Sequence, residues 1–382
     1  MTAAMASVFA LPPADAVPGA AAVRARVRDF LAAHPPPADP ARRVNCWAVA
    51  DEAFSRALGQ AGLIGMVWPC AYGGHARPAM ERYIVLEELL AAGAPVAAHW
   101  IADRQTGPLL LRYGSEAQRR RWLPGMAAGE IYACIGLSEP GAGSDLAAVR
   151  SRAERVPGGW RINGQKLWTS GAHRSHVMLA LLRSEAGSER QAGLSQFLIP
   201  MDTPGITVRP VIDLSGAHDF NEVFFDDCLV ADDALVGGEG EGWRQVTAEL
   251  ALERSGPERY LSSHALLATL IDARLADPAV TALIGSLVAE LWTLRQLSWA
   301  TAAKLAGGDD PVVEAAMVKD LGNDFEQRLP QAVQAVVSAD LDGGDDLGRC
   351  LAQLLLVSPS FSLRGGTREV MRGMIARGLG LR

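Results

Sequence analysis

The hydropathy pattern changes character twice along this chain. Residues 1–130 are mostly helical in period, residues 131–236 combine frequent glycine with strand patterns, and residues 237–382 return to the helical period. A segment with the helical period of 3.6 residues does not suit a strand, and a segment with the strand period of 2 does not suit a helix. We therefore predict an α+β fold with an N-terminal helical domain (1–130), a barrel-like antiparallel β domain (131–236) and a C-terminal helical bundle (237–382).

Apolar spacing and turn residues predict the individual elements. We expect helices at 21–33, 50–61, 80–92, 115–127, 242–251, 262–275, 280–305, 311–339 and 347–356. We expect strands at 160–162, 176–182, 194–200, 206–212 and 222–225, of which 176–182 and 194–200 are apolar enough to be buried. Asn163-Gly164 follows the first of these strands and is the strongest hairpin-turn signal in the chain.

Composition excludes several classes of protein. Of the 382 residues, 49% are hydrophobic and 21% are charged, which is typical of a globular protein and not of a disordered or collagen-like chain. The net charge of −7 gives no general attraction for nucleic acid or for an anionic membrane. An anionic ligand must therefore be held by a local site.

The cysteines and the N-terminal segment bear on location. The five cysteines are scattered and include no C-x-x-C, which argues against a disulfide framework and a zinc site and fits a reducing cytoplasm. The first residues lack a basic stretch and contain prolines at 12, 13 and 18, so we do not expect a signal peptide. No apolar run approaches the roughly 18 residues that a membrane span needs. We expect a cytoplasmic protein without metal.

Two segments in the middle of the chain carry residues suited to a ligand. Residues 135–145 (IGLSEPGAGSD) end an apolar strand in a glycine-rich turn, whose backbone amides and hydroxyls can face an anion. Residues 163–171 (NGQKLWTSG) place a tryptophan beside two hydroxyls, which suits a flat heteroaromatic ligand. An ordinary strand-to-loop turn and a buried core tryptophan are the alternatives.

Two further segments lie in the C-terminal part. Residues 252–259 (LERSGPER) hold two acid–arginine pairs in an otherwise apolar stretch, and a buried Glu253 would have a raised pKa suited to proton abstraction. A structural ion pair is the alternative there. In residues 364–377 (RGGTREVMRGMIAR) a threonine can open a helix whose N-terminus binds phosphate, or it is simply a helix cap.

Other catalytic patterns are absent. The sequence holds no H-E-x-x-H, no P-loop and no G-x-S-x-G. His99, His173 and His218 are the histidines that could act as bases or ligands, but a structural role is the better expectation for each.

These segments, in this order, resemble the acyl-CoA dehydrogenase family over nearly the whole chain. The likeness rests on GLIGMVWP (62–69), YGG (72–74), YGSE (113–116), LP (123–124), LSEPGAGSD (137–145), NGQKLW (163–168), FNEVFF (220–225) and the GGT…IAR tail (365–377). The resemblance implies a helical, a β and a second helical domain, a homodimer or homotetramer, and FAD as cofactor. It also implies α,β-dehydrogenation of an acyl-CoA thioester, with electrons passed to an electron-transfer flavoprotein.

The resemblance also implies roles for single residues. Leu137 and Ser138 match positions at the flavin ring edge, and Ser144 matches one near the pyrophosphate of FAD. The further matches are Trp168 flanking the ring, Thr169 and Ser170 near its O4 and N5, and Thr367 and Glu369 in the phosphate region.

Two departures from the family pattern matter. Many members carry a catalytic glutamate immediately before the Gly-Thr of the tail, where this chain has Gly365 and Gly366. In a subset of family members the catalytic base lies on an earlier helix instead. The resemblance to that subset implies Glu253 as the base, Arg254 as a residue near the CoA part of the substrate, and Glu258 as the alternative base. The motifs for the adenosine half of FAD are not recognisable at 275–281 or 340–346.

Two alternative functions stay open at this point. One is a flavin oxidase or monooxygenase on the same fold. The other is a non-catalytic subunit of a hetero-oligomeric acyl-CoA dehydrogenase.

Overall fold

The computed structural model describes residues 17–341 and 344–381, with the side chains of 249–253 outside that description. The chain divides into two compact units that are interleaved along the sequence. The first unit comprises the described residues of 1–49, 77–96 and 251–382, and the second comprises 50–76 and 97–250. The domain boundaries expected at 130 and 236 stay a prediction.

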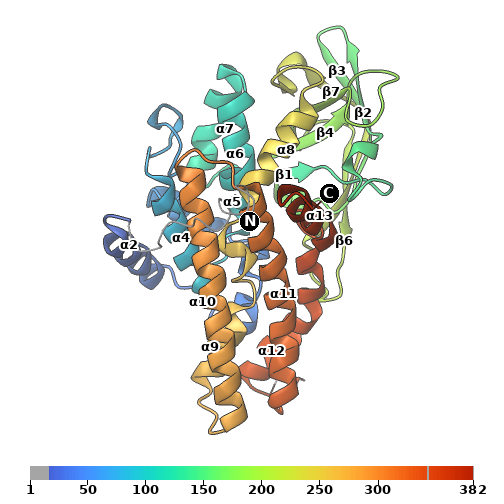
Figure 1. Cartoon of the computed structure of the whole chain (residues 1–382). Coiled ribbons are helices and arrows are strands. Elements are labelled where there is room, and N and C mark those ends of the chain that lie inside the picture. Colours follow the sequence, from blue (N-terminus) through green and yellow to red (C-terminus); the bar gives the residue numbers. More distant parts are fainter. Residues whose placement is uncertain (1–16, 342–343, 382) are drawn as a thin grey trace. The chain divides into compact units, whose positions relative to one another are not determined.

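The first unit is helical. Its helices are α2 (Ala20–Ala33), α4 (Ala79–Ala91), α9 (His264–Asp272), α10 (Pro278–Ala306), α11 (Val312–Val336), α12 (Asp346–Val357) and α13 (Arg368–Gly378). The two long helices α10 and α11 run side by side (Figure 1). Helix α10 begins where expected because the Asp277 side chain accepts a hydrogen bond from Ala279 N and Pro278 fits the first turn.

Polar side chains are built into the interior of this helical unit. Tyr83 of α4 contacts the ring of Trp299 edge-on, and its hydroxyl lies 2.9 Å from the Tyr260 hydroxyl. On the next turn of α4, the Glu87 carboxylate accepts hydrogen bonds from Arg24 at 3.0 Å and from Arg295 at 2.7 Å. These contacts join α2, α4 and α10, and they follow the rule that buried charge must be paired.

The second unit packs short helices against a sheet. The helices are α3 (Glu52–Gln60), α5 (Ala97–Ile101), the π-helical η4 (Ala102–Thr106), α6 (Gly107–Tyr113), α7 (Glu116–Ala127) and α8 (Gly242–Glu253), of which the last three residues belong to the first unit. Ser115 and Gln118 form a capping box that begins α7. The helices expected from the sequence are confirmed, with ends that differ by a few residues.

The sheet has the strand order β6-β7-β3-β2-β4-β5-β8, with β1 added beside β4. The strands are β1 (Ala133–Gly136), β2 (Arg152–Val156), β3 (Gly159–Lys166), β4 (Val177–Arg183), β5 (Leu194–Pro200), β6 (Ile206–Val211), β7 (Phe220–Ala231) and β8 (Leu235–Val236). Most pairs are antiparallel, while β1–β4 and the single contact β2–β4 are parallel. The α+β fold class with helices at both ends is confirmed.

Strands β4 and β5 are buried on both faces, which explains their continuous apolar sequences. Alternate side chains point to opposite faces. Met178 and Ala180 of β4 therefore join one core with Trp160, while Val177 and Leu179 join a second core with residues of η4, α6 and α7. The prediction of two buried strands is confirmed.

The hairpin turn expected at Asn163-Gly164 is wrong. Both residues lie within β3, where the register against β7 shifts between Ile162 and Gly164. The Asn163 side chain accepts from Asp227 N at 3.0 Å and donates to the Asp227 carboxylate at 2.9 Å, so it bonds across the sheet. A β-bulge favours the same residue types as a tight turn, so Asn-Gly suits either structure. The turn that joins β2 to β3 lies at 157–158.

Candidate functional site

The loop that follows β1 is joined to the end of β3 by backbone contacts. Leu137 O accepts a hydrogen bond from Lys166 Nζ at 3.2 Å, and Ser138 O accepts one from Leu167 N at 2.9 Å. Glu139 and Ala142 exchange two backbone hydrogen bonds, which closes a tight turn directly afterwards. The two segments that the sequence singles out in the middle of the chain therefore lie side by side.

An ion pair strengthens this junction. Lys166 is fully buried, and its Nζ lies 2.7 Å from the Glu139 carboxylate, which also accepts from the backbone amides of Arg150 and Ser151. Burial lowers the pKa of Lys166 to about 8, although the negative charge of Glu139 acts to raise that pKa. Burial alone would raise the pKa of Glu139, but Lys166 and the hydrogen bonds lower that pKa below its usual value.

The residue two positions after Lys166 has an unusual backbone. Trp168 adopts a φ of 63°, in the left-handed region that a bulky side chain rarely occupies. The residue is 56% exposed, and its ring meets that of Phe220 edge-on, with the centroids 5.7 Å apart. Such strain persists only where the surrounding structure holds it, and it gathers at functional sites.

The next residue, Thr169, is buried, and its backbone is fixed from both sides. Its N–H donates to Asn221 O at 3.0 Å, and its carbonyl accepts from Asn221 Nδ2 at 2.9 Å. Within the described part of the chain, the Thr169 hydroxyl has no hydrogen-bond partner. A buried hydroxyl without a partner is costly, and a bound ligand would remove that cost.

The other predicted residues of the second unit lie around this point. Leu137 and Ser138 are half-buried at the junction, Ser170 is exposed beside Thr169, and Ser144 is exposed at the far end of the loop. Leu137, Ser138, Trp168, Thr169 and Ser170 are thus brought together by two hydrogen-bonded segments. The feature that sequence reasoning missed here is Asn221, although it lies in the FNEVFF motif.

The predicted phosphate-region residues belong to the first unit. Thr367 caps helix α13, and its side-chain oxygen accepts from Val370 N at 3.5 Å. Glu369 is exposed on the first turn, where its own backbone amide and the Thr367 hydroxyl lower its pKa. Before the cap, Gly365 and Gly366 have φ values of 67° and 96°, and buried Lys319 donates to Gly366 O at 2.5 Å.

The acid–arginine pairs also belong to the first unit. Glu253 is the last residue of α8, and its side chain lies outside the described residues. Arg254 is buried, and its Nη1 lies 3.2 Å from the Met374 sulfur of α13. It lines a small cavity together with Leu305, Asp310, Pro311, Val312 and Ala315. Glu258 is also buried, with its carboxylate 3.6 Å from Arg259 Nε.

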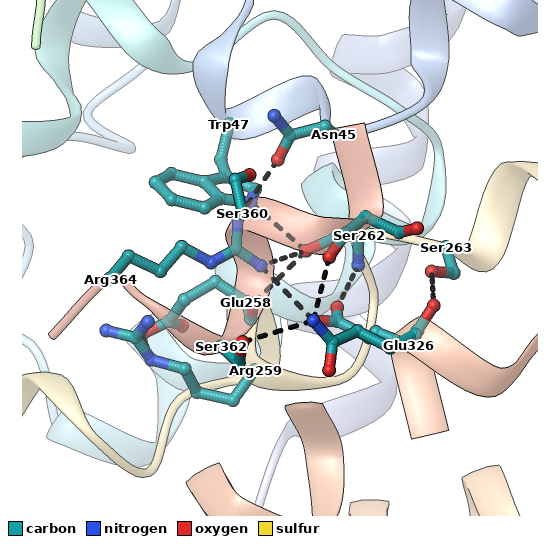
Figure 2. A network of polar contacts seen from close by, with 12 residues as sticks. Asn45, Trp47, Glu258, Arg259, Ser262, Ser263, Glu326, Ser360, Ser362 and Arg364 are labelled. Atoms are coloured by element: carbon teal, nitrogen blue, oxygen red, sulfur yellow. Dashed lines mark hydrogen bonds and ion pairs between the residues drawn. The ribbon is translucent and has the colours of Figure 1, made fainter. Parts of the chain in front are cut away.

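A buried polar network centred on Arg364 was not expected from the sequence (Figure 2). The guanidinium donates to the Ser262 hydroxyl at 2.8 Å and to Asn45 Oδ1 at 3.1 Å, and it lies 3.2 Å from the Glu326 carboxylate. Its carbon centre lies 4.0 Å from the ring centroid of Trp47. Glu326 is fully buried, and burial raises its pKa. The network anchors the residue that precedes the two glycines of the tail.

The histidines differ in their surroundings. His99 is buried, with its Nδ1 2.8 Å from the Ser55 hydroxyl. His173 and His218 stack on each other with a centroid distance of 3.9 Å. Among the residues described, no group of three or more His, Cys, Asp or Glu is arranged to hold a metal ion, and no helix is long and apolar enough to cross a membrane.

Comparison with known proteins identifies the family. Three family models match the chain: acyl-CoA dehydrogenase N-terminal domain (residues 18–130), middle domain (134–228) and C-terminal domain (264–380). The chain therefore belongs to the acyl-CoA dehydrogenase family, as the sequence motifs predicted, and it is an oxidoreductase of FAD-dependent type.

The similar proteins include acyl-CoA dehydrogenases from Mycobacterium tuberculosis. Acyl-CoA dehydrogenase IpdE1 of Mycobacterium tuberculosis is 36% identical over 342 residues, which cover 86% of this chain and 87% of that protein. Among solved structures, the Tcur3481-Tcur3483 steroid ACAD has a TM-score of 0.86 at 26% identity, covering 97% of this chain and 99% of that one. The ChsE4-ChsE5 complex from Mycobacterium tuberculosis has a TM-score of 0.82 at 26% identity, covering 96% and 98%.

Proposed function

We propose that this enzyme removes the α proton and the β hydrogen of an acyl-CoA thioester, with Glu253 as the base. FAD, when bound, accepts the β hydrogen as a hydride. The chain then has three tasks, which are to hold the flavin ring, to take up the α proton and to bind the CoA end of the substrate. The thioester oxygen gains negative charge in this reaction and needs hydrogen-bond donors.

The Trp168–Thr169 segment is the observation that carries the proposal. Exposed Trp168 lies beside a buried hydroxyl that has no partner among the described residues, and this arrangement suits the face and edge of a heteroaromatic ring. Leu137 and Ser138 are joined to that segment, so we propose that they contact the same ring together with Ser170. Ser144, Thr367 and Glu369 complete the proposed FAD contacts on its phosphate side.

The backbone of the tail supports a base outside the family's usual position. Gly365 and Gly366 both have φ values in the left-handed region, where a glutamate would be strained. Neither residue offers a carboxylate. We therefore propose Glu253 as the base, Arg254 as a contact of the CoA moiety and Glu258 as the reserve base.

Anaerobic bleaching of the flavin tests the base directly. We expect Glu253→Gln to keep FAD bound and to lose bleaching by substrate, while the matched Glu258→Gln variant keeps both. Normal bleaching by Glu253→Gln would refute the assignment. Loss of bleaching only in Glu258→Gln would transfer the role to the reserve residue.

The printed names of the similar structures support a substrate class. Since one neighbour is a steroid ACAD, we propose an acyl-CoA whose acyl group is derived from a steroid. A panel of straight-chain, branched, aromatic and steroid-derived CoA thioesters tests this, with the bleaching rate as readout. Faster bleaching by a straight-chain thioester than by every steroid-derived one would contradict it. Electrons would leave through an electron-transfer flavoprotein, and slow consumption of O₂ by the reduced enzyme would separate this enzyme from an oxidase.

A second candidate is the role of one subunit in a hetero-oligomer. Two similar structures carry paired names, and the adenosine motifs of FAD are not recognisable in this chain. Purification of the chain alone decides between the two roles. A yellow protein that is bleached by acyl-CoA supports a homo-oligomeric enzyme, whereas a colourless protein that becomes active only with a second chain supports the subunit role.

A further inference from the structure

Asn221 uses both its backbone and its side chain to hold neighbouring segments. It is fully buried at the start of β7, where its main-chain carbonyl and its Nδ2 bond the N–H and the carbonyl of Thr169. Its other side-chain atom, Oδ1, lies 3.1 Å from His173 Nδ1 and 2.8 Å from His218 Nε2. One amide group thus links the Trp168–Thr169 segment to both histidines.

The hydrogen bonds define the protonation state of this cluster. Because Nδ2 donates to Thr169 O, Oδ1 faces the histidines and can only accept, so both ring nitrogens donate to it. Arg174 Nε, which is always a donor, lies 3.0 Å from His173 Nε2. That second nitrogen therefore accepts, and His173 is neutral with its proton on Nδ1.

The surroundings oppose a positive charge on this ring. His173 is exposed overall, and partial desolvation together with Arg174 and the stacked His218 lowers its pKa. The charged groups on the packed elements are Arg174 on the same turn, Asp213 and Asp219 in the loop before β7, Arg209 on β6 and Glu222 on β7. Arg209 lies over the Phe224 ring and Glu222 bonds Gln165, so neither is committed to the histidines. The pKa of Asp219 is itself raised by burial and by Asp213.

We propose that Asn221 is a positioning residue for the Trp168–Thr169 segment, and that the His173–His218 stack on its side-chain oxygen makes this positioning sensitive to acid. The inference rests on the proposed function only in placing that segment against the flavin. Asn221 acts by fixing the backbone of Thr169, one of the two residues proposed to contact the ring. Protonation of His173 replaces an acceptor with a donor facing Arg174 and sets the imidazolium against the Arg174 cation.

Alanine variants test the positioning role. We expect Asn221→Ala to raise the FAD dissociation constant about tenfold, which corresponds to the loss of one effective hydrogen bond. The visible absorption band and the two-electron potential of the bound flavin should also shift. The matched control is Asn163→Ala, which removes two side-chain hydrogen bonds from the same sheet away from Thr169. An unchanged dissociation constant in Asn221→Ala, or an equal rise in both variants, would overturn the proposal.

His218→Phe tests the acid sensitivity and also covers the case in which Asn221→Ala does not fold. Phenylalanine keeps an aromatic ring over His173 and removes one donor and one titrating group. In the wild type we expect FAD affinity to fall at a pH below the ordinary pKa of histidine, because the pKa of His173 is lowered. In His218→Phe we expect this fall to move to higher pH, because the stacked His218 lowers the pKa of His173. The same pH profile in both proteins would overturn the acid-sensitive part.

Histidine NMR separates this proposal from the proposed function. In the flavin-free protein we expect the titration of the His173 resonance to depend on the stacked His218 ring, and Asn221→Ala to weaken that dependence. Independent titration in the wild type would overturn the proposal without reference to catalysis. Conversely, a failed test of Glu253 would leave the histidine titration unchanged.

Discussion

Lys166 and Glu139 form an ion pair of 2.7 Å in which the lysine is fully buried. Lys166 ends β3 immediately before the Trp168 segment, and Glu139 lies in the glycine-rich loop after β1. Because Lys166 also donates to Leu137 O, one side chain sets the spacing between the two segments proposed to hold the flavin ring.

Removal of the lysine charge should destabilise the second unit. Lys166→Met leaves the largely buried Glu139 carboxylate without its cation, and the expected loss is about 3–5 kcal/mol in the free energy of unfolding. Urea unfolding measures it, together with FAD binding, which should weaken. The exposed pair Arg190–Asp145 is the control, since Arg190→Met should change the stability far less than Lys166→Met does. If Lys166→Met lowers the free energy of unfolding as little as the control does, the Lys166–Glu139 pair does not stabilise the second unit.

The same pair predicts a dependence of stability on pH. The pKa of Glu139 is lowered on folding, so its contribution is full above the ordinary glutamate pKa and is lost as the pH falls through the folded value. The pKa of Lys166 is lowered to about 8 from 10.5, so the unfolded chain binds more protons between these values and this residue's contribution rises with pH there. Unfolding of wild type and Lys166→Met from pH 3 to 10 measures both slopes. Parallel curves for the two proteins would contradict the prediction.

Trp168→Gly should separate stability from function. Glycine relieves the left-handed backbone, a gain of about 1–2 kcal/mol, and loses the aromatic contact with Phe220, worth roughly 0.5–1.5 kcal/mol. We therefore expect the flavin-free protein to melt close to the wild type, while FAD affinity falls at least about tenfold. Asp227→Gly is the control, because Asp227 also has a positive φ, of 48°, but lies outside the proposed site. If Trp168→Gly and the wild type bind FAD with equal affinity, the Trp168 indole does not contribute to the FAD site.

Loss of the Arg364 guanidinium should disturb the tail of the first unit. Arg364→Met leaves Glu326 buried without its cation, and we expect a loss of about 3–5 kcal/mol by urea unfolding. Because neutral glutamine does not need the cation, the double variant Arg364→Met/Glu326→Gln should recover part of that loss. Additive losses in the double variant would show that the two side chains are not coupled.

Much of the fold could be predicted because it depends on local periodicity. The long helices α10 and α11 and the buried strands β4 and β5 follow from apolar spacing and from turn residues. The hairpin prediction at Asn163-Gly164 failed because the same dipeptide also suits a bulge, and a cross-strand bond to Asp227 decides between the two.

The candidate site was only partly predictable. The Trp168 and Ser138 segments carry recognisable motifs, so their residue types and their order could be interpreted directly. Asn221 and Glu326 could not be found in this way, because their partners lie 52 and 38 residues away in the sequence. A buried polar side chain gives no local signal of the group that satisfies it.

The sequence alone determined the helix–sheet–helix order, the family and the residue types available for chemistry, since these depend on composition and spacing. Only the tertiary structure decided the left-handed Trp168, the Lys166–Glu139 pair and the Asn221–histidine cluster. The physical reason is that burial makes an unpaired polar group costly, and which distant groups meet to satisfy it is settled only when the chain folds.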